Sequence, residues 1–288
     1  MRDMLRRGEE MSGKLYVVGT PIGNMGDMSP RGIEVLSEVD FIAAEDTRVS
    51  VKILNRFEIK KPMVSCHEHN IRERSKQITE RILAGESCAI ITDAGMPCIS
   101  DPGEELVKAC AEKGIEVSVV PGACAAIAAL AISALPTARF CFEGFLNSDE
   151  KPRRARLEEL KREKRTMIFY MPPHKLSSML SDMEEILGNR RVSVARELTK
   201  IHEEVIRTTL SELRELYSEE APRGEYVFVV EGAAEEEDTG EEISFERAVE
   251  LVQERMDGGI GASQAAKEVS VLCGGRYKKS ELYREAVK

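Results

Sequence analysis

The sequence predicts an α/β protein with two α/β domains followed by a small helical module. From Lys14 onward, short runs of β-branched residues alternate with amphipathic stretches, which is typical of strands joined by helical crossovers. The alternation changes in character after an alanine-rich stretch from 123 to about 134. An acidic stretch at 235–242, interpreted as a linker, precedes three short amphipathic segments. The expected division is a flexible leader at 1–13, α/β domains at 14–122 and 123–233, and linker and module at 234–288.

The first domain is expected to hold a mostly parallel sheet that helices cover on both faces. Ser29 followed by Pro30 predicts the start of one helix. Asn70 and Glu73 predict a capping box at the start of another helix, which Gly85 ends. The expected strands are 15–18, 41–44, 63–66, 88–91 and 117–120, with a further helix at 101–114.

The second domain is expected to combine five strands and several helices in a mixed sheet. It begins with an alanine-rich helix from Ala123 to about Ala134. Its strands are expected at 139–145, 166–170, 192–195, 204–207 and 226–230. Its further helices are expected at 153–164, 175–187 and 210–217, and those of the module at 245–256, 262–272 and 279–287.

The composition is that of an ordinary globular protein. Of the 288 residues, 42% are hydrophobic and 32% are charged, which excludes a fibrous or wholly disordered chain. No apolar run approaches the roughly 20 residues that a membrane span needs. Residues 1–14 are charged and lack an apolar stretch, so no secretory signal is expected.

The cysteines and the net charge narrow the expected location and partners. The seven cysteines form no Cys-x-x-Cys pair, and several lie in apolar segments. We therefore expect buried thiols in a reducing, cytoplasmic compartment. The formal net charge of −10 argues against unspecific binding of nucleic acid, which depends on neutralising phosphates. RNA bound at a local basic patch stays possible.

Turns that contain glycine follow three strands of the expected parallel sheet. They lie at 19–24, 93–97 and 121–123. The carboxyl ends of parallel strands share one edge, where open α/β sheets bind ligands, so the three turns together predict a cleft. Each turn alone is equally well a tight connection. The helix near Ala123 would offer free N–H groups to an anion. The first turn matches neither the dinucleotide nor the phosphate-loop fingerprint, which disfavours dinucleotides and ATP.

Seven short motifs follow one another along the chain, at 20–24, 44–48, 67–70, 100–103, 168–170, 195–200 and 230–232. Together they resemble the small-subunit (16S) rRNA cytidine 2′-O-methyltransferases, a branch of the tetrapyrrole-methylase superfamily. The glycine–proline turns are similar to those of the whole superfamily. The segments 45–48 and 197–200 resemble the rRNA branch. The resemblance implies two α/β domains with a cofactor cleft between them.

The cofactor that the resemblance implies is S-adenosylmethionine (AdoMet), held bent in this cleft. The residues implied as its contacts are Pro21, Gly95, Met96, Pro97, Ile99, Pro121, Gly122, Ala123, Tyr170, Met171, Ala195, Glu197 and Glu225. Three positions depart from the usual pattern of the family. Met96 stands in place of a threonine, Ala123 in place of a proline and Met171 in place of an acidic residue.

The implied reaction is an in-line transfer of a methyl group to a ribose 2′-hydroxyl. Orientation can supply roughly 7–11 kcal/mol of the barrier, and a general base adds about 10²- to 10⁴-fold. The groups expected around the hydroxyl are Asp46, Arg48, Asp101, Glu197 and Lys200. Other roles stay open, because Asp101 also suits an N-cap, and Arg48 and Glu197 could pair with each other.

Two basic segments are the expected RNA contacts. Residues 151–165 hold eight basic side chains against three acidic ones, and residues 276–288 hold five against two. A charged run is usually a solvated face, but the resemblance makes these segments the expected phosphate contacts. The residues chosen are Arg153, Arg154, Arg156, Lys278 and Lys279. The implied partner is small-subunit rRNA in the assembled subunit, and the superfamily implies a homodimer.

Other interpretations stay open. His67 and His69 could share a face of an extended segment, but without a third ligand no metal site is expected. The same fold and cofactor would serve a tetrapyrrole C-methyltransferase of corrin or sirohaem synthesis. A non-catalytic protein that holds RNA or AdoMet is a further alternative, which Met171 keeps open.

Overall fold

The computed structural model describes residues 13–101, 103–219, 222–234 and 243–288. The expected linker and all of the expected leader except Gly13 lie outside these residues. Contacts divide the chain into two units, residues 1–233 and residues 234–288. Among the described residues, no helix is both long and apolar enough to cross a membrane.

The first sheet has five parallel strands in the order β3-β2-β4-β1-β5, which confirms the predicted parallel sheet. The strands are β1 (Lys14–Val18), β2 (Phe41–Ala44), β3 (Met63–Ser65), β4 (Cys88–Ile91) and β5 (Glu116–Val120). The chain passes from β1 to one side of the sheet and from β4 to the other. The loops after β1 and β4 therefore lie at the topological switch point, where ligands bind in such sheets.

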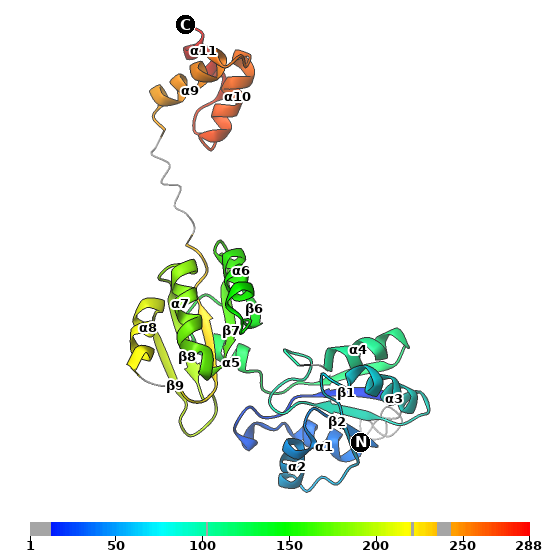
Figure 1. Ribbon diagram of the computed structural model, residues 1–288. Coiled ribbons are helices and arrows are strands. Elements are labelled where there is room, and N and C mark those ends of the chain that lie inside the picture. The colour runs from blue at the N-terminus through cyan, green and yellow to red at the C-terminus, as the bar shows by residue number, and fades with distance from the viewer. Residues whose placement is uncertain (1–12, 102, 220–221, 235–242) are drawn as a thin grey trace. The chain divides into compact units, whose positions relative to one another are not determined.

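Helices cover both faces of this sheet because its strands alternate their side chains (Figure 1). Leu15 and Val17 belong to the core under α3 and α4, whereas Tyr16 and Val18 belong to the core under α1 and α2. The helices are α1 (Pro30–Glu38), α2 (Thr47–Arg56), α3 (Ile71–Leu83) and α4 (Gly103–Glu112), with the 3₁₀ turn η1 (Met25–Asp27).

The capping predictions have different outcomes at α1 and α3. Ser29 Oγ accepts the N–H of Gly32 at 3.0 Å and Pro30 is the first residue of α1, as predicted. The capping box at Asn70 is wrong. Its side-chain oxygen accepts the N–H of His67 at 2.9 Å, in the turn before the helix, and makes no cap to α3. The turn thus takes the oxygen that a cap would need.

Helix α2 is an element that the sequence analysis did not predict. Val49, Val51 and Ile53 alternate in its sequence, as they would in a strand. The helix forms because Asp46 accepts the N–H of Arg48 at 2.8 Å and caps its first turn.

The second sheet is mixed, as predicted, with the order β6-β7-β10-β8-β9. Strand β6 runs parallel to β7, and the other neighbours pair antiparallel. The strands are β6 (Phe140–Phe145), β7 (Thr166–Met171), β8 (Arg191–Arg196), β9 (Glu204–Thr209) and β10 (Tyr226–Val230). A bulge in β6 places Gly144 at a φ of 63°, a conformation that glycine adopts without strain.

Helices also cover both faces of the second sheet. On one face, Ala129 and Leu130 of α5 pack with Val229; α6, α7 and α8 cover the other face. The helices are α5 (Ala125–Ile132), α6 (Glu150–Leu160), α7 (Leu176–Leu187) and α8 (Leu210–Glu219), with the 3₁₀ turn η2 (Pro173–Lys175). Helix α5 is shorter than predicted because Cys124 is extended and Ala134 has a φ of 61°.

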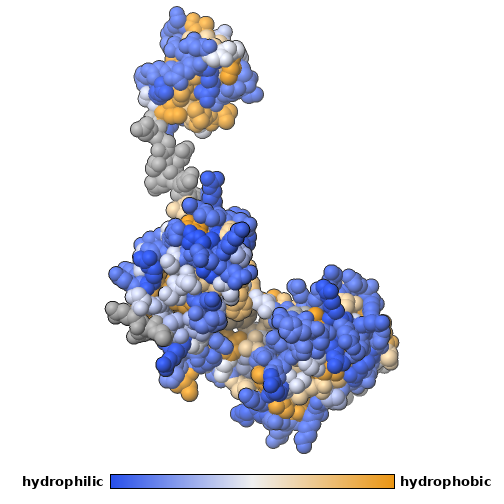
Figure 2. Space-filling model, in the orientation of Figure 1, coloured by the Kyte–Doolittle hydropathy of each residue, from blue (hydrophilic) through white to orange (hydrophobic). Residues whose placement is uncertain are grey.

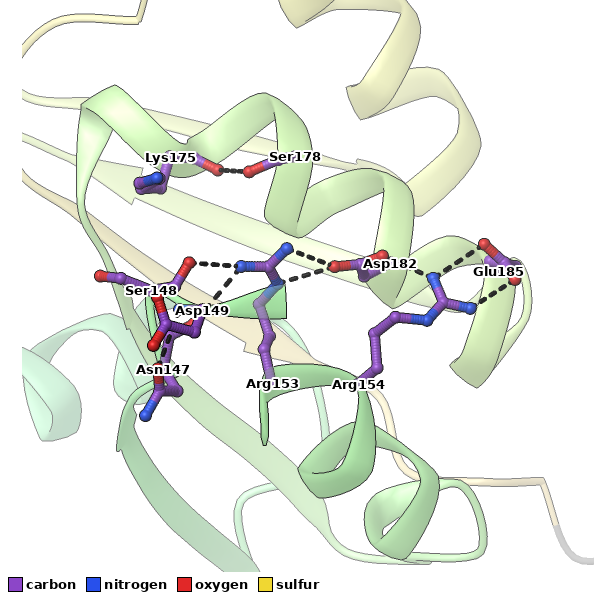
Figure 3. A network of polar contacts seen from close by, with 9 residues as sticks. All are labelled: Asn147, Ser148, Asp149, Arg153, Arg154, Lys175, Ser178, Asp182 and Glu185. Atoms are coloured by element: carbon purple, nitrogen blue, oxygen red, sulfur yellow. Dashed lines mark hydrogen bonds and ion pairs between the residues drawn. The ribbon is translucent and has the colours of Figure 1, made fainter. Parts of the chain in front are cut away.

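A buried ion pair joins α6 to α7 (Figure 3). Arg153 donates from Nε to Asp182 at 2.7 Å and from a terminal nitrogen to the carbonyl of Ser148 at 2.9 Å. Arg154 donates to the other oxygen of Asp182 and to Glu185. Arg153 and Asp182 are both buried. Because its charges are paired and hydrogen-bonded, the network holds the two helices in one register.

The second unit is a three-helix module with a core of its own. Its helices α9 (Phe245–Asp257), α10 (Ala262–Leu272) and α11 (Lys279–Ala286) begin at the predicted residues. Small side chains such as Ala248 and Ala265 lie in this core. The Tyr277 ring packs edge-on against Phe245 at 5.2 Å, and its hydroxyl donates to the carbonyl of Ile243 at 2.9 Å.

The ion pair between α6 and α7 predicts a large loss of stability when Asp182 is removed. Asp182→Ala leaves the Arg153 guanidinium buried without its carboxylate, and we expect the free energy of unfolding to fall by about 3–5 kcal/mol. Glu159→Ala, which removes an exposed partner of Arg156 within α6 itself, should cost less than about 1 kcal/mol. Urea unfolding measures both, and equal losses would contradict the structural role of the buried pair.

Candidate active site

A pocket of about 450 Å³ lies at the carboxyl ends of the strands of the first sheet. The first unit has two halves, each built around one sheet, and residues of both halves line this pocket. Its volume is in the range typical of small-molecule sites. The apolar lining includes Ile22, Met96 and Ile99 from the first half and Tyr170, Leu198 and Val227 from the second. Figure 2 shows hydrophobic surface in the hollow where these halves meet. We call this the apolar pocket.

One wall of the apolar pocket is aromatic. The Tyr170 ring lies 5.0 Å from that of Phe142 and 5.2 Å from that of Phe145, with tilted or edge-on geometry. Burial raises the pKa of the Tyr170 hydroxyl to about 12, so this side chain stays neutral at physiological pH. Such a wall suits a flat, uncharged ring of a ligand.

The charged residues that line the apolar pocket are all acidic. They are Glu45, Asp93, Asp101 and Glu225. No lysine, arginine or histidine lines it in the part of the chain that the structure describes. Glu225 pairs with Lys200 at 2.9 Å, and the other three carboxylates form no ion pair within the described residues. The pocket is therefore suited to a cationic ligand and unsuited to the phosphates of ATP or a dinucleotide.

The loops that carry these residues are tied to one another by backbone contacts. The Thr20 N–H donates to the carbonyl of Gly95 at 2.9 Å, and its hydroxyl donates to the carbonyl of Thr92 at 3.1 Å. The Gly122 N–H donates to the sulfur of Met96 at 3.3 Å. The turns after β1, β4 and β5 thus form one rigid edge, as the three glycine turns predicted.

The loop after β4 contains unusual backbone conformations. Cys98 and Ser100 have φ values of 71° and 59°, which non-glycine residues adopt only at a cost. Asp101 supports the loop, because one of its oxygens accepts the N–H groups of Cys98 at 3.0 Å and Gly103 at 2.6 Å. The Ser100 side chain lies next to Gly144 in the β6 bulge. The strained loop is therefore fixed from both halves of the unit.

A second pocket, of about 610 Å³, adjoins the first and is lined mainly by polar side chains. It includes Arg48, Ser65, His67 and His69. Nδ1 of His67 is buried and lacks a hydrogen-bond partner within the described residues. We call this the polar pocket. It shares Glu45, Asp93 and Ser100 with the apolar pocket, so these three residues form a common wall.

Asp46 and Arg48 lie in the polar pocket and form a tight pair. Arg48 donates to one oxygen of Asp46 at 2.6 Å and from Nε to the other at 3.0 Å. These bonds, with the Arg48 N–H, lower the pKa of Asp46 to about 2. Arg48 pairs with Asp46 and not with Glu197, so the pairing considered from the sequence is wrong.

Asp93 differs from Asp46 in its surroundings. It is half-buried, and one of its oxygens accepts the N–H of Asp46 at 3.2 Å. Burial, and then the negative charge of Glu45, raise the pKa of Asp93 above its ordinary value. The Glu45 side chain is held in place by the Thr92 hydroxyl, which donates to it at 2.7 Å.

Glu197 and Lys200 lie on the rim of the second half. The Lys200 ammonium donates to both Glu197 and Glu225 at 2.9 Å. The hydrogen bond from the Lys200 ammonium lowers the pKa of Glu197. Glu197 has a φ of 51°, and its side chain also accepts the N–H of Glu225 at 2.8 Å. The two residues thus hold Glu225 at the apolar pocket without lining it themselves.

The residues implied as cofactor contacts fall into two groups. Those that line the apolar pocket are Gly95, Met96, Ile99, Tyr170, Met171, Ala195 and Glu225. Pro21, Pro97, Pro121, Gly122 and Ala123 are not among its lining residues, and they belong to the turns that support it. Glu197 does not line it either, and it accepts the N–H of Glu225. The sequence analysis did not select Glu45, Asp93 and Ser100. All three lie in segments that the sequence analysis had noted as turns or motifs. Glu45 directly follows β2, and Asp93 lies two residues beyond the end of β4.

The structure contradicts the expectation that Arg153 contacts RNA, because its guanidinium is buried against Asp182. The other basic residues of the segment are largely paired with acids. Arg154 pairs with Asp182 and Glu185, and Arg156 pairs with Glu143 and Glu159. The charge count over residues 151–165 did not include Asp182, Glu185 and Glu143, which lie outside that segment and pair with its arginines in the fold. Lys278 and Lys279 are exposed and form no ion pair within the described residues.

Metal ligation and disulfides find no support in the described part of the chain. No group of three or more His, Cys, Asp or Glu side chains is arranged there to hold a metal. The His67 and His69 rings pack edge-on with centroids 5.8 Å apart. The seven cysteines are free, and burial raises the pKa of the Cys66 thiol to about 11.

A parallel and a mixed sheet, with two adjoining pockets at the strand ends of the first, define a two-sheet α/β protein with a small-molecule binding site. The sequence profile of the Tetrapyrrole (Corrin/Porphyrin) Methylases matches residues 14–214, and the chain belongs to this family. A cobalt precorrin-4 methyltransferase of cobalamin biosynthesis has the same fold. Its solved structure superposes with a TM-score of 0.56 over 75% of this chain and 94% of its own, at 16% identity.

Two relatives carry the name ribosomal RNA small subunit methyltransferase I. The protein of Synechocystis sp. is 46% identical over 259 residues, which cover 90% of this chain and 92% of that protein. The protein of Thermotoga maritima is 46% identical over 220 residues, which cover 76% of this chain and 99% of that protein. About a quarter of this chain thus has no counterpart in the second relative.

The pair of Asp46 and Arg48 predicts an unusually acidic carboxyl group. In a ¹³C NMR titration, the Asp46 carboxyl carbon should have its midpoint at about pH 2, and Arg48→Met should return it toward the ordinary value of about 3.9. Because the folded state favours the ionised form, this pair stabilises the fold above about pH 4, and that effect is lost as the pH falls toward 2. A midpoint near 4 in the unaltered protein would contradict the pairing.

Proposed function

We propose that this protein transfers the methyl group of AdoMet to the ribose 2′-hydroxyl of a cytidine in small-subunit ribosomal RNA. The observation that carries the proposal is the pair of adjoining pockets. An apolar pocket whose charged lining is acidic meets a polar pocket at a common wall. A cationic donor and a hydroxylic acceptor would face each other across that wall.

The apolar pocket fits AdoMet in shape and charge. Its aromatic and aliphatic walls suit the adenine ring, and Glu45, Asp93 and Asp101 suit the sulfonium and ammonium groups. Gly95 lets the turns pack closely under the pocket, because a Cβ there would lie 3.2 Å from Ile22 and 3.2 Å from the carbonyl oxygen of Ala123. Bound AdoMet would supply a methyl group activated by the positive charge of its sulfur.

The side chains around the polar pocket would position the acceptor. Arg48 is largely exposed while its partner Asp46 fixes its direction, so the guanidinium is free to meet a phosphate. His67 and His69 offer further groups to a ribose or a phosphate. The strained loop around Ser100 would hold the common wall rigid, so that the reacting atoms meet in line.

The relatives favour rRNA over a tetrapyrrole as the acceptor. Both of the named relatives are ribosomal RNA methyltransferases by name and match this chain at 46% identity. A binding protein without turnover would not need a donor pocket that opens onto an acceptor pocket.

We assign the chemistry to the two α/β domains at 14–122 and 123–233, and RNA affinity to the helical module. The family profile lies wholly in the first unit. The module offers Lys278 and Lys279 as exposed cations at the start of α11. They would add phosphate contacts within the assembled subunit and leave the donor site unchanged.

A homodimer is the assembly that we propose. Helix α5 is apolar around its whole circumference, yet Ile127 is 49% exposed, and Val119 on the edge strand β5 is 51% exposed. Exposed apolar side chains on an edge strand and on the helix that follows it in the chain suit burial by a second copy of the chain. The seven free cysteines support a reducing, cytoplasmic location.

Filling the mouth of the apolar pocket should weaken AdoMet binding. Ala94 is exposed and lines the pocket, so Ala94→Trp should raise the Kd for AdoMet at least about 10-fold, or ~1.4 kcal/mol, without unfolding the protein. Calorimetric titration measures the affinity. Ala111→Trp, on the exposed side of α4, is the control and should leave the Kd unchanged. Equal affinities for both variants, or displacement of AdoMet by ATP, would contradict the donor site.

Reversing two charges of the module should weaken RNA binding in a salt-dependent way. For Lys278→Glu with Lys279→Glu, the magnitude of the slope of log K against log salt for small subunits should fall by about 1.4–1.8, since each phosphate contact contributes about 0.7–0.9. The control replaces the exposed Lys60 and Lys108 by glutamate, which changes the net charge equally. If both pairs give the same slope, the module does not contact phosphate.

A further inference from the structure

The common wall of the two pockets limits where the proposed methyl transfer can occur. Only Glu45, Asp93 and Ser100 line both pockets among the described residues. A donor in one pocket and a hydroxyl in the other meet only at this wall. The proton of the hydroxyl must therefore leave beside these three side chains, of which two are carboxylates.

The other candidate acids are poorly suited to take that proton. Both oxygens of Asp46 accept from Arg48, and it lines only the polar pocket. Asp101 lines only the apolar pocket, where one of its oxygens accepts two N–H groups of the strained loop. Neither Asp46 nor Asp101 lines both pockets, and the carboxylate of Asp46 is also paired with a cation.

The two carboxylates of the wall differ in how firmly they are held. Glu45 Oε2 accepts the Thr92 hydroxyl at 2.7 Å, and Thr92 is buried. Asp93 accepts a single backbone N–H, that of Asp46, through Oδ1 at 3.2 Å. Asp93 thus keeps one oxygen available at the wall, whereas Glu45 is fixed as a neighbouring negative charge.

On the basis of the proposed function, we infer that Asp93 is the general base that accepts the proton of the 2′-hydroxyl, and that Glu45 is a positioning residue that acts through Asp93. The 2′-oxygen forms a bond to the methyl carbon while the carbon–sulfur bond breaks. The electron pair of that bond goes to sulfur, which becomes an uncharged thioether. The hydroxyl proton moves to the Asp93 carboxylate, which releases it to water after the product leaves.

The electrostatics of the wall support this assignment. Burial and the charge of Glu45 raise the pKa of Asp93, which makes its ionised form a stronger base than an ordinary aspartate. The other ionisable groups that line the two pockets are Glu45, Asp46, Arg48, His67, Glu68, His69, Asp101, Cys124, Tyr170, Glu225 and Tyr226. Since the carboxylate is the active form, the rate should rise with pH through the pKa of Asp93 and then level off.

The first test is the rate of a single methyl transfer to small ribosomal subunits at saturating AdoMet. We expect Asp93→Asn to lower this rate by about 10²- to 10⁴-fold even though AdoMet is saturating, with the Kd for the subunit changed less than about 3-fold. Because Asp93 also faces the donor pocket, AdoMet affinity is measured separately and the rates are compared at saturation. Asp93→Glu should restore part of the rate, because it keeps a carboxylate. A normal rate for Asp93→Asn, or a loss of AdoMet affinity that accounts for the whole defect, overturns the inference.

The second test separates a base from a structural residue. In ¹³C NMR of the protein without ligands, the Asp93 carboxyl carbon should titrate above the ordinary value of about 3.9. Glu45→Gln removes the neighbouring charge, so it should lower that midpoint and move the acid limb of the pH–rate profile to lower pH by the same amount. An unmoved limb overturns the inference.

The outcomes also separate this inference from the proposed function. If the unaltered protein transfers methyl groups to small subunits and Asp93→Asn does so equally fast, only the assignment of Asp93 fails. If the unaltered protein binds AdoMet but never methylates the subunits, the proposed function fails. The inference, which rests on it, is then overturned even if the NMR midpoints behave as expected.

Discussion

The structure of the site depends on the close approach of two backbones, at Gly19 and Gly122. A Cβ added to Gly19 would lie 2.6 Å from the Cα of Gly122, so neither position tolerates a side chain without movement of the backbone. This approach brings the ends of β1 and β5 together, and the Gly19 N–H donates to the carbonyl of Val120 at 3.1 Å. The loop after β4 joins this contact, because the sulfur of Met96 accepts the N–H of Gly122. The apolar pocket is the space that this packed edge leaves between the two sheets.

On that edge, the chemistry of the pockets follows from how each carboxylate is paired. Asp46 is paired with a guanidinium, Asp101 accepts backbone N–H groups, and Asp93 has a like charge beside it. Carboxylates that meet at one edge of the sheet therefore differ in role, and the pKa is lowered at Asp46 and raised at Asp93. The fold is shared with a precorrin methyltransferase at 16% identity, so the fold alone does not determine the acceptor. We propose that the side chains of the polar pocket select the acceptor.

The sequence was sufficient to predict what depends on local patterns. Strand alternation predicted both sheets, and the glycine turns predicted the edge that carries the apolar pocket. It was insufficient where a side chain had several partners to choose from. Asn70 bonds to His67 and not to the helix, and Arg153 is buried by an acid that lies 29 residues further along the chain. Asp93 and Glu45 were passed over because their role depends on two pockets that meet only in the folded protein.

The central claim is that this chain methylates a ribose 2′-oxygen in small-subunit rRNA. The most direct measurement is transfer of a labelled methyl group from AdoMet to small ribosomal subunits isolated from cells that lack the protein. Alkaline hydrolysis of the recovered RNA follows. A methylated 2′-oxygen cannot attack the adjacent phosphate, so we expect the label in an alkali-resistant dinucleotide. Unlabelled RNA, together with intact binding of AdoMet, would contradict the account and indicate a small-molecule acceptor.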